Sequence, residues 1–232
     1  MDRLEATLLG RSGDDPVAAA LRSELAVRQL SPRHAQDLLS AFRMDVTKLR
    51  YRDWDDLIGY CTYSAMPVGR FVLDVHGETR ATWPANDALC AALQIINHLQ
   101  DCGADYRNLD RVYVPLDALA DSGASVEALG SDRASPELLR SIRQLACRTG
   151  GLLRQSRSFS ARIADSRLAL EVAVIQSLAE RLVGVLGRRD PLSERVHLGT
   201  AEVAGFALLG LIRAGTRRVG RLFAAGQKPQ DA

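Results

Sequence analysis

The sequence predicts an all-α protein, on three observations. Hydrophobic residues make up 47% of the 232 residues and only 8 are proline, a composition that favours helices. Apolar residues recur at helical spacing, most clearly over 168–186. No alternating run of convincing length predicts a strand. A chain of this length can bury the core of one sizeable domain, which we expect over residues 1–212, followed by a basic tail over 213–232.

Start and stop signals divide the domain into helices. Gly10 is expected to end the first helix, since glycine readily adopts the left-handed conformation at a helix end. Ser31 as N-cap and Pro32 at the first helical position predict the start of the third helix. Asp53 is expected to cap the fourth helix, and Asn86 with its neighbour Asp87 the central one. The expected helices cover 1–10, 17–30, 32–46, 55–76, a central segment from 86, 135–149 (ended by Gly150-Gly151) and 168–186.

The charge balance argues against one class of partner. Lys and Arg number 30 and Asp and Glu 28, which gives a formal net charge of +2. Nucleic-acid binding requires a basic surface that neutralises phosphates, and this balance gives no case for it. We therefore expect no nucleic-acid partner.

The four cysteines and four histidines form no recognisable pattern. Without a C-x-x-C spacing, the cysteines are typical of the reduced thiols of a cytosolic protein. We interpret His98 as a packing or hydrogen-bonding residue. Because no apolar run is long enough to cross a bilayer and no signal-peptide core is present, we expect a cytoplasmic protein. The tail over 213–232 is expected either to contact the inner face of the membrane peripherally or to be a frayed cationic helix end.

One stretch, 94–115, carries the strongest chemical signal. Gln94, Asn97, Asp101 and Asp105 are spaced i, i+3, i+7 and i+11, so they share one face of a helix. Carboxylate and amide oxygens are the ligands that Mg²⁺ prefers, usually together with water and substrate phosphate oxygens. The row therefore indicates a Mg²⁺–diphosphate site, and the alternative is a solvated helix face. Because the flanking residues are largely apolar, we expect the row to point into a cavity.

Two segments resemble one enzyme family. The pattern Q-x-x-N-x-x-x-D-x-x-x-D, followed by R-x-Y-x-P at 111–115, resembles the second aspartate-rich motif of the squalene/phytoene synthases. Residues 60–69, YCTYSAMPVG, resemble a second segment of the same family. Gln100 stands where phytoene and dehydrosqualene synthases usually carry Arg. In this respect the sequence is more similar to the bacterial hydroxysqualene synthases of hopanoid biosynthesis.

The resemblance implies a fold and a set of site residues. The fold is an isoprenoid-synthase-type helical bundle with a central cavity, and Mg²⁺ is the implied cofactor. Tyr60, Asp101 and Asp105 are implied as catalytic residues, and Asn97, Asp101 and Asp105 as metal ligands. Tyr60, Ser64 and Val68 are expected to line the same cavity. The implied substrate-binding residues are Arg50, Ser64, Val68, Gln94, Asn97, Arg111, Tyr113 and Arg195. The resemblance implies that Arg50, and Asp45 nearby, contact the diphosphate or its metal ions. For both residues an ordinary ion pair at a helix end is an equal alternative.

One departure from the family pattern concerns the first aspartate-rich motif. Residues 1–10 resemble a stretch downstream of that motif, so the resemblance implies a chain without it, N-terminally truncated relative to the family. The sequence 117–121 contains another D-x-x-x-D. It lacks the Gln and Asn partners, and we interpret it as a chance match without a metal-binding role. A one-sided carboxylate site would hold fewer metal ions, so we expect impaired turnover in a chain of this kind.

The leading functional hypothesis is a prenyl-diphosphate-using synthase of C30 isoprenoid biosynthesis. It converts presqualene diphosphate to hydroxysqualene by Mg²⁺-assisted loss of diphosphate and capture of the cation by water. Two alternatives stay open: a head-to-head condensing synthase that makes phytoene or presqualene diphosphate, and a non-catalytic family member that acts as an assembly or binding factor.

Overall fold

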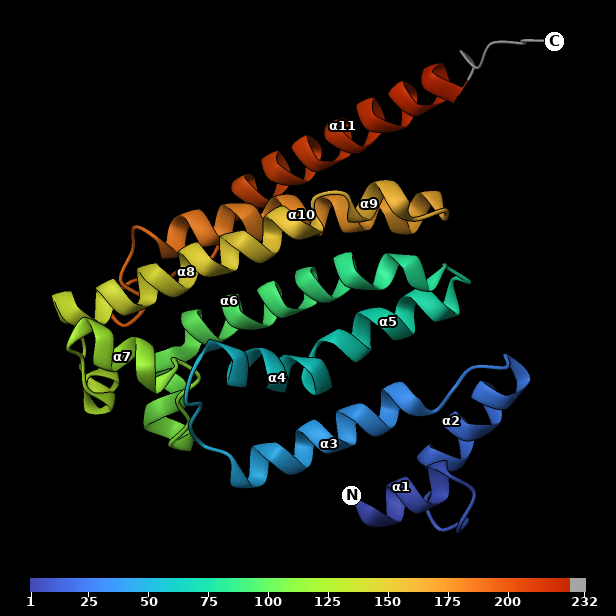
Figure 1. The fold of residues 1–232 in the computed structure, drawn as a ribbon, viewed down its shortest axis with the longest axis horizontal. Coiled ribbons are helices and arrows are strands. Elements are labelled where there is room, and N and C mark those ends of the chain that lie inside the picture. The colour runs from blue at the N-terminus through green and yellow to red at the C-terminus, as the bar shows by residue number, and fades with distance from the viewer. Residues whose placement is uncertain (226–232) are drawn as a thin grey trace.

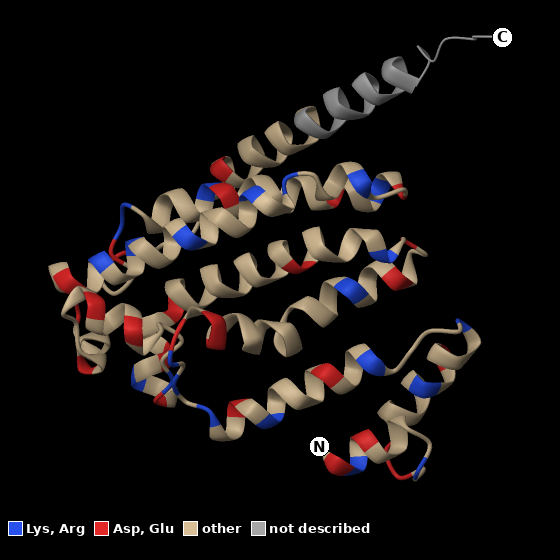
Figure 2. Ribbon diagram, in the orientation of Figure 1, with Lys and Arg blue, Asp and Glu red and all other residues tan. Residues whose placement is uncertain are grey.

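The predicted fold class is confirmed. The computed structural model describes the backbone of residues 1–225 and the side chains of residues 1–212, so the side chains of the predicted basic tail lie outside the described residues. Over residues 1–225 there is no strand, and one isolated backbone bridge joins Arg50 to Val112. Within the same residues, no helix combines the length and the apolar character that crossing a bilayer requires. Lys and Arg are interspersed with Asp and Glu over the ribbon in Figure 2, in keeping with the small net charge.

The described chain consists of α-helices and two 3₁₀ segments, with a longer connection over 187–199 between the last two helices. In chain order these are α1 (Asp2–Leu8), α2 (Pro16–Val27), α3 (Arg33–Thr47), α4 (Trp54–Ser64), α5 (Met66–Val75), η1 (Arg80–Thr82), α6 (Trp83–Leu109), α7 (Leu116–Ser122), η2 (Val126–Gly130), α8 (Pro136–Ser156), α9 (Phe159–Arg162), α10 (Ser166–Leu186) and α11 (Thr200–Ala225).

Helix α6 is the centre of the molecule. It packs against α4 and α5 on one side and against α8 and α10 on the other, with α3 beyond α4 and α5, and with α11 against α10 (Figure 1). Its buried stripe includes Leu89, Ile95, Ile96 and Leu99, each at most 3% exposed, which belong to the main hydrophobic core. A 27-residue helix with so wide an apolar surface is stable because neighbouring helices cover it.

Several helix ends agree with the sequence signals. Gly10 adopts the left-handed conformation, φ +75°, just after α1. The Asp53 carboxylate accepts a hydrogen bond from the Asp56 amide at 2.8 Å and caps α4. Ser135 caps α8 by accepting from the Leu138 amide at 3.2 Å. These are local bonds between residues three apart, so sequence spacing alone can predict them.

The expected single helix over 55–76 is wrong, because the chain breaks it at Ala65. Helix α4 ends at Ser64 and α5 begins at Met66, with Pro67 in its first turn. Proline has no amide hydrogen and restricts the residue before it, so a helix tends to end ahead of a proline and to start anew with it. The break turns α5 away from the direction of α4.

The expected cap of the central helix at Asn86 and Asp87 is also wrong. Helix α6 begins at Trp83, with Pro84 in its first turn. Asn86 is 2% exposed and donates to the Met66 carbonyl of α5 at 3.5 Å. Asp87 pairs with Arg70 of α5 at 2.5 Å. Both polar side chains therefore make contacts between α5 and α6, which spacing along one helix cannot distinguish from a cap.

The break expected at Gly150-Gly151 does not occur, and α8 continues to Ser156. Buried residues on both sides of the pair, including Leu145 and Leu153, pack into the core between α6 and α10. Glycine in a helix interior costs only about 1 kcal/mol each relative to alanine, which this packing offsets.

Candidate functional site

The polar row lies on one face of α6, as its spacing predicts, and two of its four residues are exposed. Asn97 and Asp101 are exposed, whereas Gln94 and Asp105 are partly buried. The buried face of α6 is the opposite one, which carries Ile95, Leu99 and their neighbours. No side chain of residues 1–212 buries Asn97 or Asp101, so the expectation that the apolar flanks enclose the row is corrected.

The two carboxylates of the row repel each other. Burial and the negative charge of Asp101 raise the pKa of Asp105, and Arg111 opposes this shift only in part. Among the described residues neither carboxylate forms an ion pair. Two like charges left together on adjacent helical turns destabilise the helix unless a cation lies between them.

The row has the ligand chemistry of a Mg²⁺ site. Two carboxylates and the Asn97 amide supply oxygen ligands, the type that Mg²⁺ prefers. Within residues 1–212 no three His, Cys, Asp or Glu side chains are placed to chelate a metal together. The residues present therefore fit an ion that completes its coordination with water and diphosphate oxygens, and they would not form a cage by themselves.

The repulsion at Asp105 predicts a stability effect. Asp105→Asn should raise the melting temperature by about 1–2 °C at pH 7 in EDTA, because asparagine carries no charge to face Asp101. The pKa of folded Asp105 lies above the ordinary value of 3.8, so ionisation opposes folding. The increase in melting temperature should be complete at pH values above that raised pKa and should vanish below about pH 3.8.

Thermal unfolding followed by circular dichroism measures this difference. Asp132→Asn is the matched control, because it removes an exposed carboxylate that lies outside any helix and has no acidic residue within four positions. The control should leave the melting temperature unchanged. A lower melting temperature for Asp105→Asn at pH 7 would show that the carboxylate has a stabilising partner.

A second set of polar groups surrounds Tyr60. Tyr60 is 3% exposed, and its hydroxyl donates to the Asp45 carboxylate at 2.8 Å. Arg111 donates to the Asp45 main-chain carbonyl at 2.6 Å. The Tyr113 ring lies 5.8 Å from the Tyr60 ring, centre to centre. Burial and the neighbouring Asp45 carboxylate raise the pKa of Tyr60, so its phenol remains protonated at neutral pH.

Asp45 has a partner in the site that the sequence does not predict. It lies at the end of α3, 15 residues before Tyr60, and no motif links the two. The structure brings them together because α3 packs against α4. The segment 110–116 follows α6 and adds Arg111 and Tyr113 to the same cluster.

His98 connects this cluster to the polar row. Its Nε2 lies 3.0 Å from Nε2 of Gln94. Its ring stacks on Tyr113, with an interplanar angle of 11° and 3.4 Å between centroids. Burial and the Arg111 charge lower the pKa of His98 to about 3, so the ring is neutral at physiological pH.

Arg50 forms the ion pair that the sequence left open as an alternative. Its guanidinium lies 2.5 Å from the Asp110 carboxylate and also donates to the Asp110 carbonyl. Asp110 ends α6 in the left-handed conformation, φ 51°. Arg50 thus fastens the segment before α4 to the end of α6.

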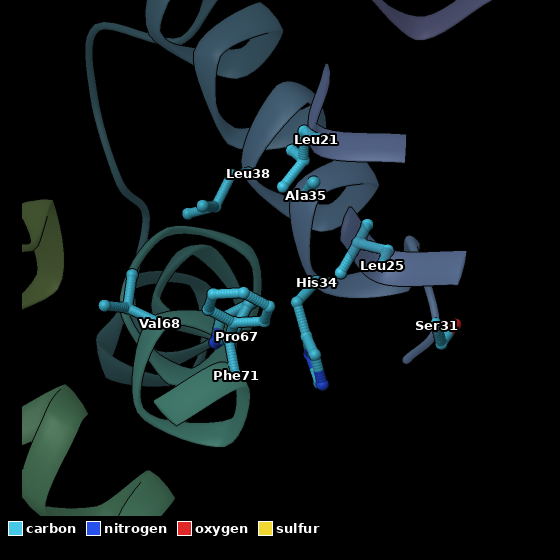
Figure 3. A pocket seen from close by; sticks show the side chains of 9 residues that line it. All are labelled: Leu21, Leu25, Ser31, His34, Ala35, Leu38, Pro67, Val68 and Phe71. Carbon is cyan, nitrogen blue, oxygen red and sulfur yellow. The ribbon is translucent and has the colours of Figure 1, made fainter. Parts of the chain in front are cut away.

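Ser64 and Val68 do not line one cavity with Tyr60. The Ser64 hydroxyl donates to the Tyr60 carbonyl within α4 at 3.1 Å. Val68 faces a separate apolar pocket of ≈ 180 Å³ between α2, α3 and α5, together with Phe71 and Leu38 (Figure 3). The expected common face depended on an unbroken helix, and the break at Ala65 removes it.

The segment after α10 is attached to α6. Gln100 donates to the carbonyl of Val196, which is 2% exposed. Arg195, the residue before Val196, is exposed. A Cβ at Gly103 would lie 2.5 Å from Leu192, so glycine permits the segment to pack this closely. Gln100 therefore anchors to α6 the segment that contains Arg195.

Comparisons with known proteins agree with this architecture. The sequence profile of the squalene/phytoene synthase family matches residues 1–202. A hydroxysqualene synthase of Rhodopseudomonas palustris is 60% identical over 211 residues, which cover 90% of this chain and 72% of the relative. Phytoene synthase 1 of Arabidopsis thaliana is 38% identical over 132 residues, which cover 54% of this chain and 31% of the relative.

A solved structure shares the fold. The squalene synthase HpnC from Alicyclobacillus acidocaldarius superposes with a TM-score of 0.72 at 31% identity, covering 81% of this chain and 70% of that one. The helical order around α6, the polar row and the profile match over 1–202 lead to one assignment. The chain belongs to the squalene/phytoene synthase family.

Proposed function

We propose that the protein is a hydroxysqualene synthase, which converts presqualene diphosphate to hydroxysqualene. The observation that carries this proposal is the row of Gln94, Asn97, Asp101 and Asp105 on one face of α6, adjoining the Tyr60–Asp45 cluster. The relatives at 60% and 56% identity, both named hydroxysqualene synthase, support the same reaction.

The proposed reaction begins with loss of diphosphate. The C–O bond of the diphosphate ester breaks, and its electron pair leaves with the diphosphate. Asn97, Asp101 and Asp105 would hold Mg²⁺, which neutralises the charge that develops on the leaving group when it is bound. Arg195, in the segment that Gln100 anchors to α6, is proposed to contact the diphosphate as well.

The cation that remains rearranges next to aromatic groups. The rings of Tyr60, Tyr113 and Tyr51 lie within 5.8 Å of one another, centre to centre. Aromatic faces stabilise cations without reacting with them. Because the Tyr60 hydroxyl already donates to Asp45, this acidic pair can position the water that attacks the cation and can accept the proton it loses.

An assay with two substrates tests the proposal. The purified chain is incubated with Mg²⁺ and either presqualene diphosphate or farnesyl diphosphate, in water enriched in ¹⁸O, and products are identified by mass spectrometry. We expect hydroxysqualene carrying one ¹⁸O from presqualene diphosphate.

Two other outcomes would overturn the proposal. Presqualene diphosphate, formed from farnesyl diphosphate alone, would favour the condensing alternative. Absence of product from either substrate, with no binding of Mg²⁺ and diphosphate in calorimetry, would favour a non-catalytic role. Peripheral contact with a membrane through the tail over 213–232 stays a prediction.

A further inference from the structure

His98 is the one histidine of α6, and its two contacts join residues from different parts of the candidate site. One contact is the 3.0 Å approach to the Gln94 amide nitrogen, one helical turn earlier. The other is the parallel stack on Tyr113, which belongs to the segment after α6. The ring also lies 6.2 Å from the Tyr60 ring, centre to centre.

The geometry of the first contact fixes which nitrogen carries the proton. An amide nitrogen donates hydrogen bonds and does not accept them. Nε2 of His98 must therefore accept from Gln94, which leaves the ring neutral with its hydrogen on Nδ1. The Gln94 amide group is then held in one orientation, in which its nitrogen faces His98 and its carbonyl oxygen is directed away from the ring.

The stack gives the same ring a second effect. Tyr113 is 8% exposed and packs against both Tyr60 and Tyr51. A side chain that holds Gln94 by a hydrogen bond and Tyr113 by stacking fixes the spacing between the polar row and the aromatic cluster. An aliphatic residue at this position would fill similar space but would supply no acceptor for Gln94.

We propose that His98 is a positioning residue of this site, which orients the Gln94 carboxamide toward the diphosphate end of the substrate while its ring holds Tyr113 beside Tyr60. The inference rests on the proposed function for the identity of the substrate. It predicts that the effect of His98 on turnover passes through Gln94.

A double-mutant cycle tests this coupling. His98→Phe keeps an aromatic ring for Tyr113 but removes the acceptor, and Gln94→Leu removes the donor. Each single variant should lower kcat/KM for presqualene diphosphate by about tenfold, the loss expected for one hydrogen bond. The double variant should lose no more than either single variant. His98→Asn, whose side-chain carbonyl can accept from Gln94, should recover part of the activity.

The results that overturn the inference are specific. Losses that multiply in the double variant, or full activity in His98→Phe, would show that His98 does not act through Gln94. A second readout does not depend on turnover: ¹⁵N NMR of the intact chain should show a neutral His98 with its hydrogen on Nδ1. If no variant forms product but this tautomer is found, the proposed function fails while the arrangement of His98 stands. A hydrogen on Nε2 would refute the arrangement in either case.

Discussion

Replacing Asp101 by asparagine is expected to lower kcat for diphosphate loss by about 10²–10³-fold. Asp101 is exposed on α6, and within residues 1–212 its carboxylate forms no ion pair, so its charge does not stabilise the fold. The charge instead belongs to the row that would hold Mg²⁺ against the leaving diphosphate. Removing a preorganised electrostatic group from such a site raises the barrier while leaving the protein folded.

Single-turnover kinetics at saturating Mg²⁺ measure the loss, and a Mg²⁺ titration shows whether metal affinity falls with it. Asp121→Asn provides the control, because it makes the same chemical change on an exposed residue at the end of α7. We expect the control to react like the unmodified protein. An Asp101→Asn variant with unchanged kcat and metal affinity would place the Mg²⁺ site elsewhere.

Replacing Gly69 by alanine is expected to destabilise the protein by about 2–4 kcal/mol, which corresponds to a fall in melting temperature of roughly 4–12 °C. Gly69 lies in α5, where it faces α6. A Cβ there would lie 2.1 Å from Oδ1 of Asn86 and 2.6 Å from Sγ of Cys90. Asn86 is 2% exposed and hydrogen-bonded to Met66, so it cannot move aside without losing that bond.

Gly59 offers a matched control in the neighbouring helix. It is exposed in α4, and a Cβ there would meet no atom within 4 Å. Gly59→Ala should therefore stabilise the protein by about 0.5–1 kcal/mol, the ordinary gain for this change in a helix interior. Thermal and urea unfolding of both variants compare the two glycines. Equal effects at the two positions would mean that α5 and α6 are not in the close contact described here.

The sequence alone was sufficient for those features that depend on neighbours along the chain. The caps at Asp53 and Ser135 and the end of α1 at Gly10 are bonds or conformations within one turn. The polar row of α6 follows from helical spacing, whatever lies around it. The family could be identified because two of its motifs are contiguous segments, 60–69 and 94–115.

Only the tertiary structure decided which groups meet across helices. Three such contacts join residues that have no fixed spacing in the sequence. They are the Tyr60–Asp45 hydrogen bond, the stack of His98 on Tyr113 and the hydrogen bond from Gln100 to Val196. Exposure of the polar row likewise depends on which helices cover α6, because an amphipathic pattern predicts a buried face and does not say what lies opposite it.

Helix continuity differs from the prediction at two positions, for a distant reason at the first and a local reason at the second. Helix α8 continues through Gly150-Gly151 because its packing against α6 and α10 outweighs the low helix propensity of the two glycines. The break at Ala65 separates Tyr60 from Val68 because Pro67 removes an amide hydrogen that a continuous helix requires. The sequence thus determined the family, the helical fold class and the polar row of α6, while packing between helices determined which side chains surround that row.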